Sequence, residues 1–215
     1  MRLCFLGGTH AAHHLAKAAW SKGFDIIDAP EHAELVFVSL DTPTDEAGNR
    51  DLDAVRQLAD SVRDVSAPVV LTSAVPPGFT RNLGMDIWHQ AETLRMKDAE
   101  FRAANPEMLI VGNPDPSADI PDAYLAYLMA FKCPILRMTW EEAEFAKIAI
   151  NACLASQVET TNRLAAAAAK VGASWDRIAN VLKHDRRIGL HAYLEPGRWQ
   201  DSRHLLRDMW TLEGL

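Results

Sequence analysis

The sequence predicts an α/β protein, with a parallel sheet followed by a long helix and a small helical domain. Three observations support this fold class. Short apolar runs alternate with helix-like stretches through the first third of the chain, which is the pattern of βαβ units. A glycine turn at residues 7–8 follows the first apolar run. Apolar residues then recur at helical spacing over residues 140–170, which indicates one long helix.

The elements of the predicted sheet follow in order along the first part of the chain. Strands are expected at residues 2–6, 24–27, 35–40, 68–73 and 135–138. Helices are expected between them at residues 11–22 and 52–65. Residues 105–122 contain four X-Pro pairs, and this density of breakers predicts a loop around one short strand.

The last third of the chain is predicted to be helical. Helices are expected at residues 140–170, 175–183 and 205–212, and Gly172 is a natural end for the long helix. The predicted domains are therefore a dinucleotide-binding domain over residues 1–138 and a helical domain over residues 139–215.

Composition excludes several classes of protein. The 215 residues carry a net charge of −7 with scattered Lys and Arg, so no nucleic-acid partner is expected. No apolar run is long enough for a membrane span or a signal peptide, so a cytoplasmic location is expected. Cys4, Cys133 and Cys153 lie far apart. They are expected to be buried thiols rather than disulfides or metal ligands.

The glycine turn predicts a Rossmann-like domain. Gly7, Gly8, Thr9, His10 and Ala11 stand between a strand and a helix, where a helix N-terminus can bind a pyrophosphate. With Gly8 as the central glycine of GxGxxG, Ala11 takes the third position and a leucine takes the first, which departs from the pattern.

Asp28 stands at the end of the second predicted strand, where a carboxylate binds an adenosine ribose and repels a 2′-phosphate. This favours NAD over NADP. The alternative is a simple tight turn, with Asp28 capping the following segment.

Three histidines begin the first helix. His10, His13 and His14 have the spacing that places imidazoles together, and imidazole is a common metal ligand. No carboxylate nearby in the sequence completes a site. We therefore predict no metal, and interpret these residues as helix-start histidines near a phosphate or solvent.

Five segments, in order, resemble the UDP-glucose/GDP-mannose (nucleotide-sugar) dehydrogenase family. They are Asp41 followed by Thr42-Pro43-Thr44-Asp45 (family TPTD), residues 73–81 including Ala74 (STVPPGTTR), Asn105-Pro106-Glu107 (NPE), residues 143–152 (AExxKxxxNA) and residues 185–189 (DxRIG). The resemblance covers nearly all of this chain but only the amino-terminal part of a family member, without its carboxyl-terminal nucleotide-binding domain. The stretch between Asp28 and Thr42 is also shorter than in the family.

The resemblance implies NAD as the cofactor, a nucleotide-sugar-like substrate and a role in polysaccharide biosynthesis. It adds Thr42, Pro43, Thr44 and Ala74 to the cofactor-binding residues and assigns Arg187 to the substrate. Glu107, Lys147, Asn151 and Asp208 fall on the family's active-site acid, lysine, asparagine and final aspartate. Taken alone, Glu107, Lys147, Asn151 and Asp208 would be ordinary loop, helix-face or buried polar groups.

One departure changes the expected chemistry. Family members oxidise a sugar CH2OH to a carboxylate through a cysteine thiohemiacetal and thioester, within a GGSCFxKD motif. Residues 202–208 align with this motif and place His204 at the cysteine position. Imidazole is a good general base but a poor substitute for the thiolate.

The predicted function is therefore an NAD-linked oxidoreductase limited to a two-electron alcohol/aldehyde step. Lys147 and Asn151 share one helix face and can polarise a carbonyl, with His204 or Asp208 beside them. The alternative is a non-catalytic dimeric binding or scaffold protein, a pseudoenzyme derived from the family. By resemblance, the long helix forms a homodimer interface.

Overall fold

A computed structural model describes all residues from 1 to 215. The chain forms two compact units, Met1–Lys147 and Ile148–Leu215. The long helix α6 (Trp140–Lys170) begins in the first unit and continues into the second. The domain boundary at residue 138 stays a prediction.

The first unit is built on a seven-stranded sheet with the order β2-β1-β3-β4-β5-β6-β7. The strands are β1 (Arg2–Leu6), β2 (Asp25–Ile27), β3 (Leu35–Val38), β4 (Val69–Leu71), β5 (Trp88–Ala91), β6 (Leu109–Gly112) and β7 (Ile135–Met138). All neighbouring strands pair in parallel except β5 and β6, which are antiparallel. The α/β class is confirmed, but the sheet is mixed rather than wholly parallel. The reason is that the chain re-enters the sheet at the edge where it left: Ala91, the end of β5, pairs with Ile110, near the start of β6.

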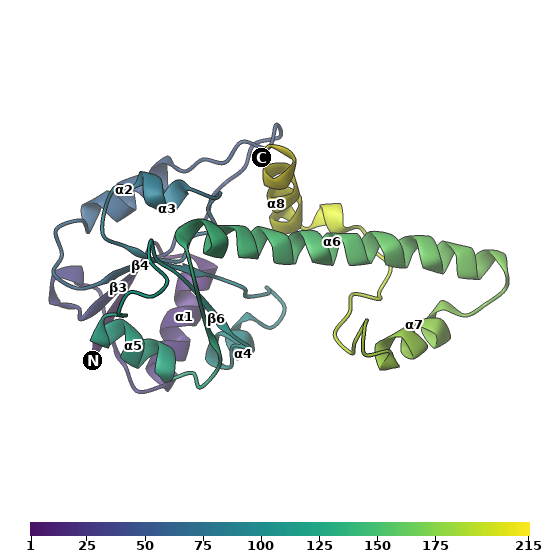
Figure 1. Cartoon of the computed structure of the whole chain (residues 1–215), viewed down its shortest axis with the longest axis horizontal. Helices are drawn as coiled ribbons and strands as arrows, with labels where there is room; N and C mark the ends of the chain where they lie inside the picture. Colours follow the sequence, from purple (N-terminus) through teal and green to yellow (C-terminus); the bar gives the residue numbers. More distant parts are fainter. The chain divides into compact units, whose positions relative to one another are not determined.

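Helices cover both faces of this sheet (Figure 1). On one face lie α1 (His10–Ser21), α4 (Ala99–Ala104) and α5 (Asp122–Met129), and on the other lie α2 (Asp53–Ser61) and α3 (Phe79–Asn82). Each face has its own apolar cluster: Ala18, Ala103 and Tyr127 belong to the first, and Val55 and Phe79 to the second. The sheet is therefore the middle layer of three.

Several short elements were not predicted. No pattern indicated α3, β5, α4 or α5, each eight residues or fewer. In β5 all four residues are buried, yet two of them, His89 and Gln90, are polar. The Oε1 atom of Gln90 accepts a hydrogen bond from the Tyr124 hydroxyl at 3.1 Å, so the buried amide is paired. A polar strand of this kind lacks the apolar run by which buried strands are recognised.

The first turns of α6 are anchored in the first unit. Thr139 and Glu142 form a capping box: Glu142 N donates to Thr139 Oγ1 at 3.3 Å, and Thr139 N donates to Glu142 Oε2 at 2.7 Å. Trp140 Nε1 donates to Ile87 O at 3.0 Å. A Cβ added to Gly112 would lie 2.8 Å from Ala143 Cβ, so β6 needs glycine where the helix crosses it.

The second unit contains the rest of α6, α7 (Trp175–His184) and α8 (Arg203–Glu213). α6 ends at Lys170 as predicted, and Gly172 follows at φ +71°. The segment between α7 and α8 is held to α6 by hydrogen bonds. Thr161 Oγ1 donates to Tyr193 O at 2.8 Å, and the side-chain amide of Asn162 donates to Gly197 O and accepts from Gly197 N. These bonds satisfy polar groups that a small apolar core would leave unpaired.

Two further expectations can be compared with the structure. Cys4 is buried and Cys133 is half-buried, but Cys153 is exposed, so the prediction of three buried thiols was wrong for Cys153. It lies on α6 two residues from the buried Asn151, and two residues turn a helix to its other side. None of the helices has the length and apolar character needed to cross a membrane.

Candidate functional site

The glycine turn after β1 depends on Gly7. Its φ is +116°, and an added Cβ would lie only 1.9 Å from Ser39 O, in the segment after β3. Ala12 is 3% exposed on the side of α1 that faces the sheet. The geometry therefore favours Gly7, Thr9 and Ala12 as the three fingerprint positions, one residue later than the sequence suggested. The close backbone approach that requires Gly7 was not visible in the sequence.

Thr9 closes the amino-terminal end of α1. Its Oγ1 accepts from Ala12 N at 3.0 Å and lies 3.1 Å from Ser39 Oγ, so the side chain is turned inward. The amides of His10 and Ala11 are among those that a helix leaves without an internal acceptor. Gly8 has open space beside its Cα. These features leave room and donors for a pyrophosphate, so the turn fits the diphosphate of NAD.

The segments that follow β3 and β4 are joined beside this turn. Leu40 N donates to Ser73 Oγ at 2.7 Å, and Thr42 Oγ1 donates to Ala74 O at 2.9 Å. Parallel strands bring their carboxyl ends to one edge of the sheet, so the predicted residues Thr42, Pro43, Thr44 and Ala74 share the edge that holds the glycine turn. The chain also reverses its direction of progress across the sheet between β1 and β3, where α/β proteins commonly bind ligands.

Asp28 directly follows β2, which pairs with β1 at the same edge. Burial, together with the nearby carboxylates of Asp28 and Glu31, raises the pKa of the Cys4 thiol. The carboxylate of Asp28 is therefore close enough to β1 for its charge to influence the Cys4 thiol. This is the region expected to receive the adenosine ribose.

Glu144 has a structural role that the sequence did not reveal. Its carboxylate is 1% exposed and accepts from Gly78 N at 2.6 Å and Thr80 N at 2.8 Å. Burial raises its pKa in spite of these bonds. Glu144 thus holds the Pro76-Pro77-Gly78 turn that follows Ala74. The AExxK motif contained this residue, but no role was assigned to it.

The three histidines of α1 do lie together. The Nε2 atoms of His10 and His14 are 3.0 Å apart, and the His13 and His14 ring centroids are 5.4 Å apart. Lys17 forms an ion pair with Glu100 of α4 at 2.8 Å. Partial burial, followed by the charges of His10 and His13, lowers the pKa of His14. No group of three or more His, Cys, Asp or Glu side chains has the arrangement of a metal site.

Glu107 lies in the loop before β6. Its side chain is 74% exposed and pairs with Arg102 Nη1 at 3.3 Å. Because β6 begins beside the end of β5, this loop is at the same sheet edge as the glycine turn. The carboxylate is therefore solvated, and a bound substrate would have to displace the arginine or share it.

In the second unit, the structure brings together two residues predicted from separate motifs. Asn151 Nδ2 donates to Asp208 Oδ2 at 2.6 Å, and both side chains are buried. Arg207 Nε donates to Asp208 Oδ1 at 3.0 Å. Asp208 therefore holds the Asn151 amide in one orientation, which leaves Asn151 Oδ1 and the second N–H available to other groups.

The remaining predicted side chains lie one turn from this pair. Lys147 precedes Asn151 by four residues on α6, and His204 precedes Asp208 by four residues on α8. Lys147 is half-buried and His204 is exposed. Cys153 is on the opposite side of α6 from Asn151, so it does not replace the family's thiol there.

Arg187 lies in the turn after α7. Its guanidinium is 89% exposed and forms a fork with Asp185, with distances of 3.0 Å and 2.7 Å to the two carboxylate oxygens. This pairing lowers the pKa of Asp185. The DxRIG motif thus orients its own arginine toward solvent, where it is accessible to an anionic ligand.

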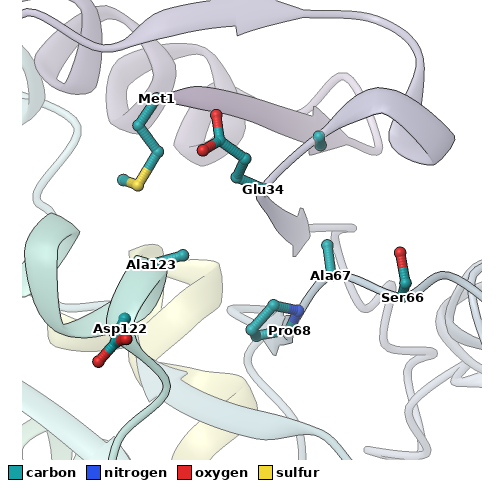
Figure 2. A pocket seen from close by; sticks show the side chains of 8 residues that line it. Met1, Glu34, Ser66, Ala67, Pro68, Asp122 and Ala123 are labelled. Atoms are coloured by element: carbon teal, nitrogen blue, oxygen red, sulfur yellow. The ribbon is translucent and has the colours of Figure 1, made fainter.

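An open pocket lies at the opposite edge of the sheet (Figure 2). It is lined by Met1, Ala33, Glu34, Ser66, Ala67, Pro68, Asp122 and Ala123. Three of these residues stand immediately before β1, β3 and β4, at the amino ends of the strands. None of the predicted site residues lines this pocket.

Comparison with known proteins identifies the family. Residues 10–122 match the NAD binding domain of the UDP-glucose/GDP-mannose dehydrogenase family, and residues 141–213 match its central domain. The chain belongs to this family. NAD as the predicted cofactor is confirmed at the level of the family's NAD binding domain.

Individual relatives are longer than this chain. The UDP-glucose 6-dehydrogenase of Pseudomonas aeruginosa is 30% identical over 179 residues, which is 74% of this chain and 39% of the relative. An uncharacterized protein of Methanocaldococcus jannaschii is also 30% identical, over 73% of this chain and 19% of its own length. The chain therefore spans well under half the length of these relatives.

Solved structures show the same fold. A UDP-glucose dehydrogenase from Pyrobaculum islandicum has a TM-score of 0.74 at 20% identity, over 99% of this chain and 67% of that one. A GDP-mannose dehydrogenase from Pseudomonas aeruginosa has a TM-score of 0.75 at 20% identity, over 99% of this chain and 65% of that one. At this identity the likeness extends to architecture only.

Proposed function

We propose that this protein is an NAD-linked oxidoreductase that performs one two-electron step between an alcohol and an aldehyde on a nucleotide-sugar-like substrate. The observation that carries the proposal is the buried Asn151–Asp208 pair. These residues are 57 positions apart, and they come from the motifs that mark the active site in the family. The family's NAD binding domain supports the cofactor, and a cytoplasmic location, where NAD is available, is part of the proposal.

The proposed residue roles follow from the chemistry of alcohol oxidation. NAD supplies the acceptor for the hydride that leaves the alcohol carbon. The exposed imidazole of His204 takes the proton of the substrate hydroxyl. The Lys147 ammonium stabilises the alkoxide as it forms, and the second N–H of Asn151 donates to the same oxygen. Asp208 positions that amide. Loss of one hydride and one proton converts the alcohol into the aldehyde.

The positions of the three cysteines support an oxidation that ends at the aldehyde. Oxidation of the aldehyde to a carboxylate requires an adduct that can donate a second hydride, and the family forms it on a thiol. Cys4 is buried, and burial raises the pKa values of both Cys4 and Cys133. Neither thiol has the character of an activated nucleophile, and Cys153 projects from the side of α6 opposite Asn151.

Thermal unfolding with NAD tests the first requirement. A ligand present at ~100 times its dissociation constant stabilises the folded state by about 2.7 kcal/mol, so a clear rise in Tm is expected. Nucleotide sugars should then reduce NAD with one equivalent of NADH per aldehyde formed. Two equivalents per substrate, with a carboxylate product, would contradict the two-electron limit.

Substitutions test the assigned residues. Lys147→Met and His204→Gln should abolish NADH formation while the NAD-induced Tm rise remains, because both act on the substrate rather than on the cofactor. His184→Gln changes an exposed histidine in the same unit as His204 and is the matched control for that substitution. Full activity in Lys147→Met would remove the proposed role of this lysine.

The enzyme and its alternative, a non-catalytic dimeric protein, would share a dimer interface. The second unit exposes large apolar side chains on α6 and α7, including Leu164, Ile178 and Val181, and apolar side chains that gather on a surface are typical of protein interfaces. We propose that this surface forms a homodimer in either case. A protein that dimerises but shows no Tm rise with NAD or NADH would be the scaffold rather than the enzyme.

A further inference from the structure

The first turns of α1 hold three imidazoles at the place proposed for the dinucleotide diphosphate. The function proposed above uses the backbone of this turn and leaves the histidine rings without a role. His10 and His14 are in direct contact, with 3.0 Å between their Nε2 atoms and 4.3 Å between their ring centroids. His13 packs edge-on against His14.

The contact between the two Nε2 atoms limits the charge of the pair. One nitrogen must carry the hydrogen while the other offers its lone pair. In this geometry at most one of the two rings can therefore be an imidazolium. The free amides at the start of α1 carry partial positive charge, and the first turn contains no acidic residue to offset it. Without an anion, this environment opposes protonation of His14, whose pKa is lowered by partial burial and by the charges of His10 and His13.

Of the charged groups that act on His14, Glu100 favours its protonation, whereas His13 and Lys17 oppose it. Lys17 on α1 is paired with Glu100 on α4 at 2.8 Å. Arg102 on α4 is paired with Glu107 at 3.3 Å. Asp28 follows β2, the strand into which α1 leads. A diphosphate at the helix N-terminus would therefore add a strong negative charge beside the histidines. This charge would favour the protonated form of the histidine pair over the neutral form.

We propose that His10 and His14 form a proton-linked diphosphate site, in which binding of NAD is accompanied by uptake of a proton on this histidine pair. The inference rests on the proposed function, because NAD is the diphosphate concerned. The hydrogen bond between the two Nε2 atoms remains when one proton is added, because the imidazolium can donate to the neutral ring. The additional N–H can then donate to a phosphate oxygen, in a charge-assisted bond that is stronger than a neutral one. Cofactor affinity then increases as the pH falls through the range in which histidine titrates.

Calorimetry of the whole chain with NAD measures the proton directly. The binding enthalpy is measured near about pH 6.5, the ordinary pKa of histidine, in two buffers of different ionisation enthalpy such as PIPES and Bis-Tris. The dependence of the observed enthalpy on the buffer gives the number of protons taken up. We expect proton uptake, and a Kd that tightens by up to about tenfold per unit of induced pKa change as the pH is lowered.

Matched variants and ligands assign the proton. His10→Gln/His14→Gln retains hydrogen-bonding groups but cannot titrate, so uptake should vanish and the Kd should become independent of pH. His184→Gln, in the second unit, should retain the uptake. Adenosine, which lacks the diphosphate, should bind without uptake. Circular dichroism verifies the fold of the double variant, and the exposed single variant His10→Gln replaces it if it unfolds.

The outcomes separate this inference from the proposed function. Binding of NAD without proton uptake, or uptake that persists in the double variant, overturns the proton-linked site and leaves the oxidoreductase proposal intact. Failure of the wild-type chain to bind NAD in either buffer removes the oxidoreductase proposal, and the proton-linked site with it.

Discussion

Two residues of the first unit, Gly7 and His89, show how strongly individual positions are constrained by their surroundings. Gly7 sits against the backbone of Ser39. His89 is 2% exposed in the middle of the sheet, and its Nδ1 has no hydrogen-bond partner. Both constraints come from residues distant in the sequence, and both lead to measurable predictions.

Gly7→Ala should disrupt the turn that we propose for the cofactor. An added Cβ would overlap Ser39 O at 1.9 Å, whereas Gly8 has open space beside it. We expect Gly7→Ala to reduce the free energy of unfolding by roughly 2–4 kcal/mol, because the backbone must move. Gly8→Ala should cost only about 1 kcal/mol for its positive φ. Urea denaturation of both variants measures the difference, and equal losses would contradict the argument.

His89 should make the stability of the fold sensitive to acid. Burial lowers its pKa from 6.5 to about 4, so the unfolded chain binds more protons than the folded chain between these values. The stability contributed by neutral His89 is complete above pH 6.5 and is lost as the pH falls toward 4. At about pH 5 the loss is about 2 kcal/mol. The wild-type protein should therefore lose more unfolding free energy between neutral pH and about pH 5 than His89→Gln does. The two losses should differ by about 2 kcal/mol. An unchanged pH dependence would show that other groups cause it.

At the scale of elements, the start of α6 organises the segment that follows β4. Glu144 binds the amides of Gly78 and Thr80, and Glu141 pairs with Arg81. These two acids belong to the same helix, but one is buried and the other is partly exposed. The buried one satisfies two backbone donors, so it should be the more important for stability.

Glu144→Gln should therefore reduce the free energy of unfolding more than Glu141→Gln does. A glutamine at 144 offers one acceptor oxygen, so either the half-buried Gly78 amide or the buried Thr80 amide loses its partner, at a cost of about 1–3 kcal/mol. Glu141→Gln removes an exposed ion pair worth about 0.2–1 kcal/mol. Chemical denaturation of the two variants side by side tests the ranking. The reverse order would mean that the carboxylate of Glu144 is not needed to hold the turn.

At the scale of the whole molecule, the two units differ in how completely they bury apolar surface. The first has an apolar cluster on each face of its sheet. Among residues 148–215, the buried apolar side chains are only Ile148, Ala155, Val158, Ala168 and Ala179. So small a core is a marginal source of stability, which is why we propose that the second unit is completed by a second copy of the chain.

Sedimentation tests the homodimer. The wild-type protein should sediment as a dimer at micromolar concentration. Val181→Glu, at a side chain that is 69% exposed, should shift it to the monomer, because a charge is costly to bury in an apolar interface. Glu159→Gln serves as a control on the polar side of α6, where Glu159 accepts from Trp199 Nε1 within the same chain. A wild-type monomer would reject the proposal.

Long periodic elements could be predicted from the sequence because the information that determines them is local. The bounds of β1, β7 and α6 agree with the prediction, since each is marked by an apolar run or by an uninterrupted helical spacing. The ordered motifs likewise indicated the family, which the comparisons confirm. Short elements such as β5 and α4 could not be found, because burial by the rest of the fold stabilises them more than their own residues do.

Some residues of the candidate site could be predicted from the sequence, but their contacts could not. The motifs named Asn151 and Asp208, yet only the packing of α8 against α6 makes one the hydrogen-bond partner of the other. The register of the glycine fingerprint was decided by the approach of Ser39 to Gly7, and the role of Glu144 by the turn it binds. The sequence by itself determined the longer elements, their order and the family motifs they carry. The tertiary structure decided which groups meet, because contacts between residues tens of positions apart depend on how the sheet and its helices pack.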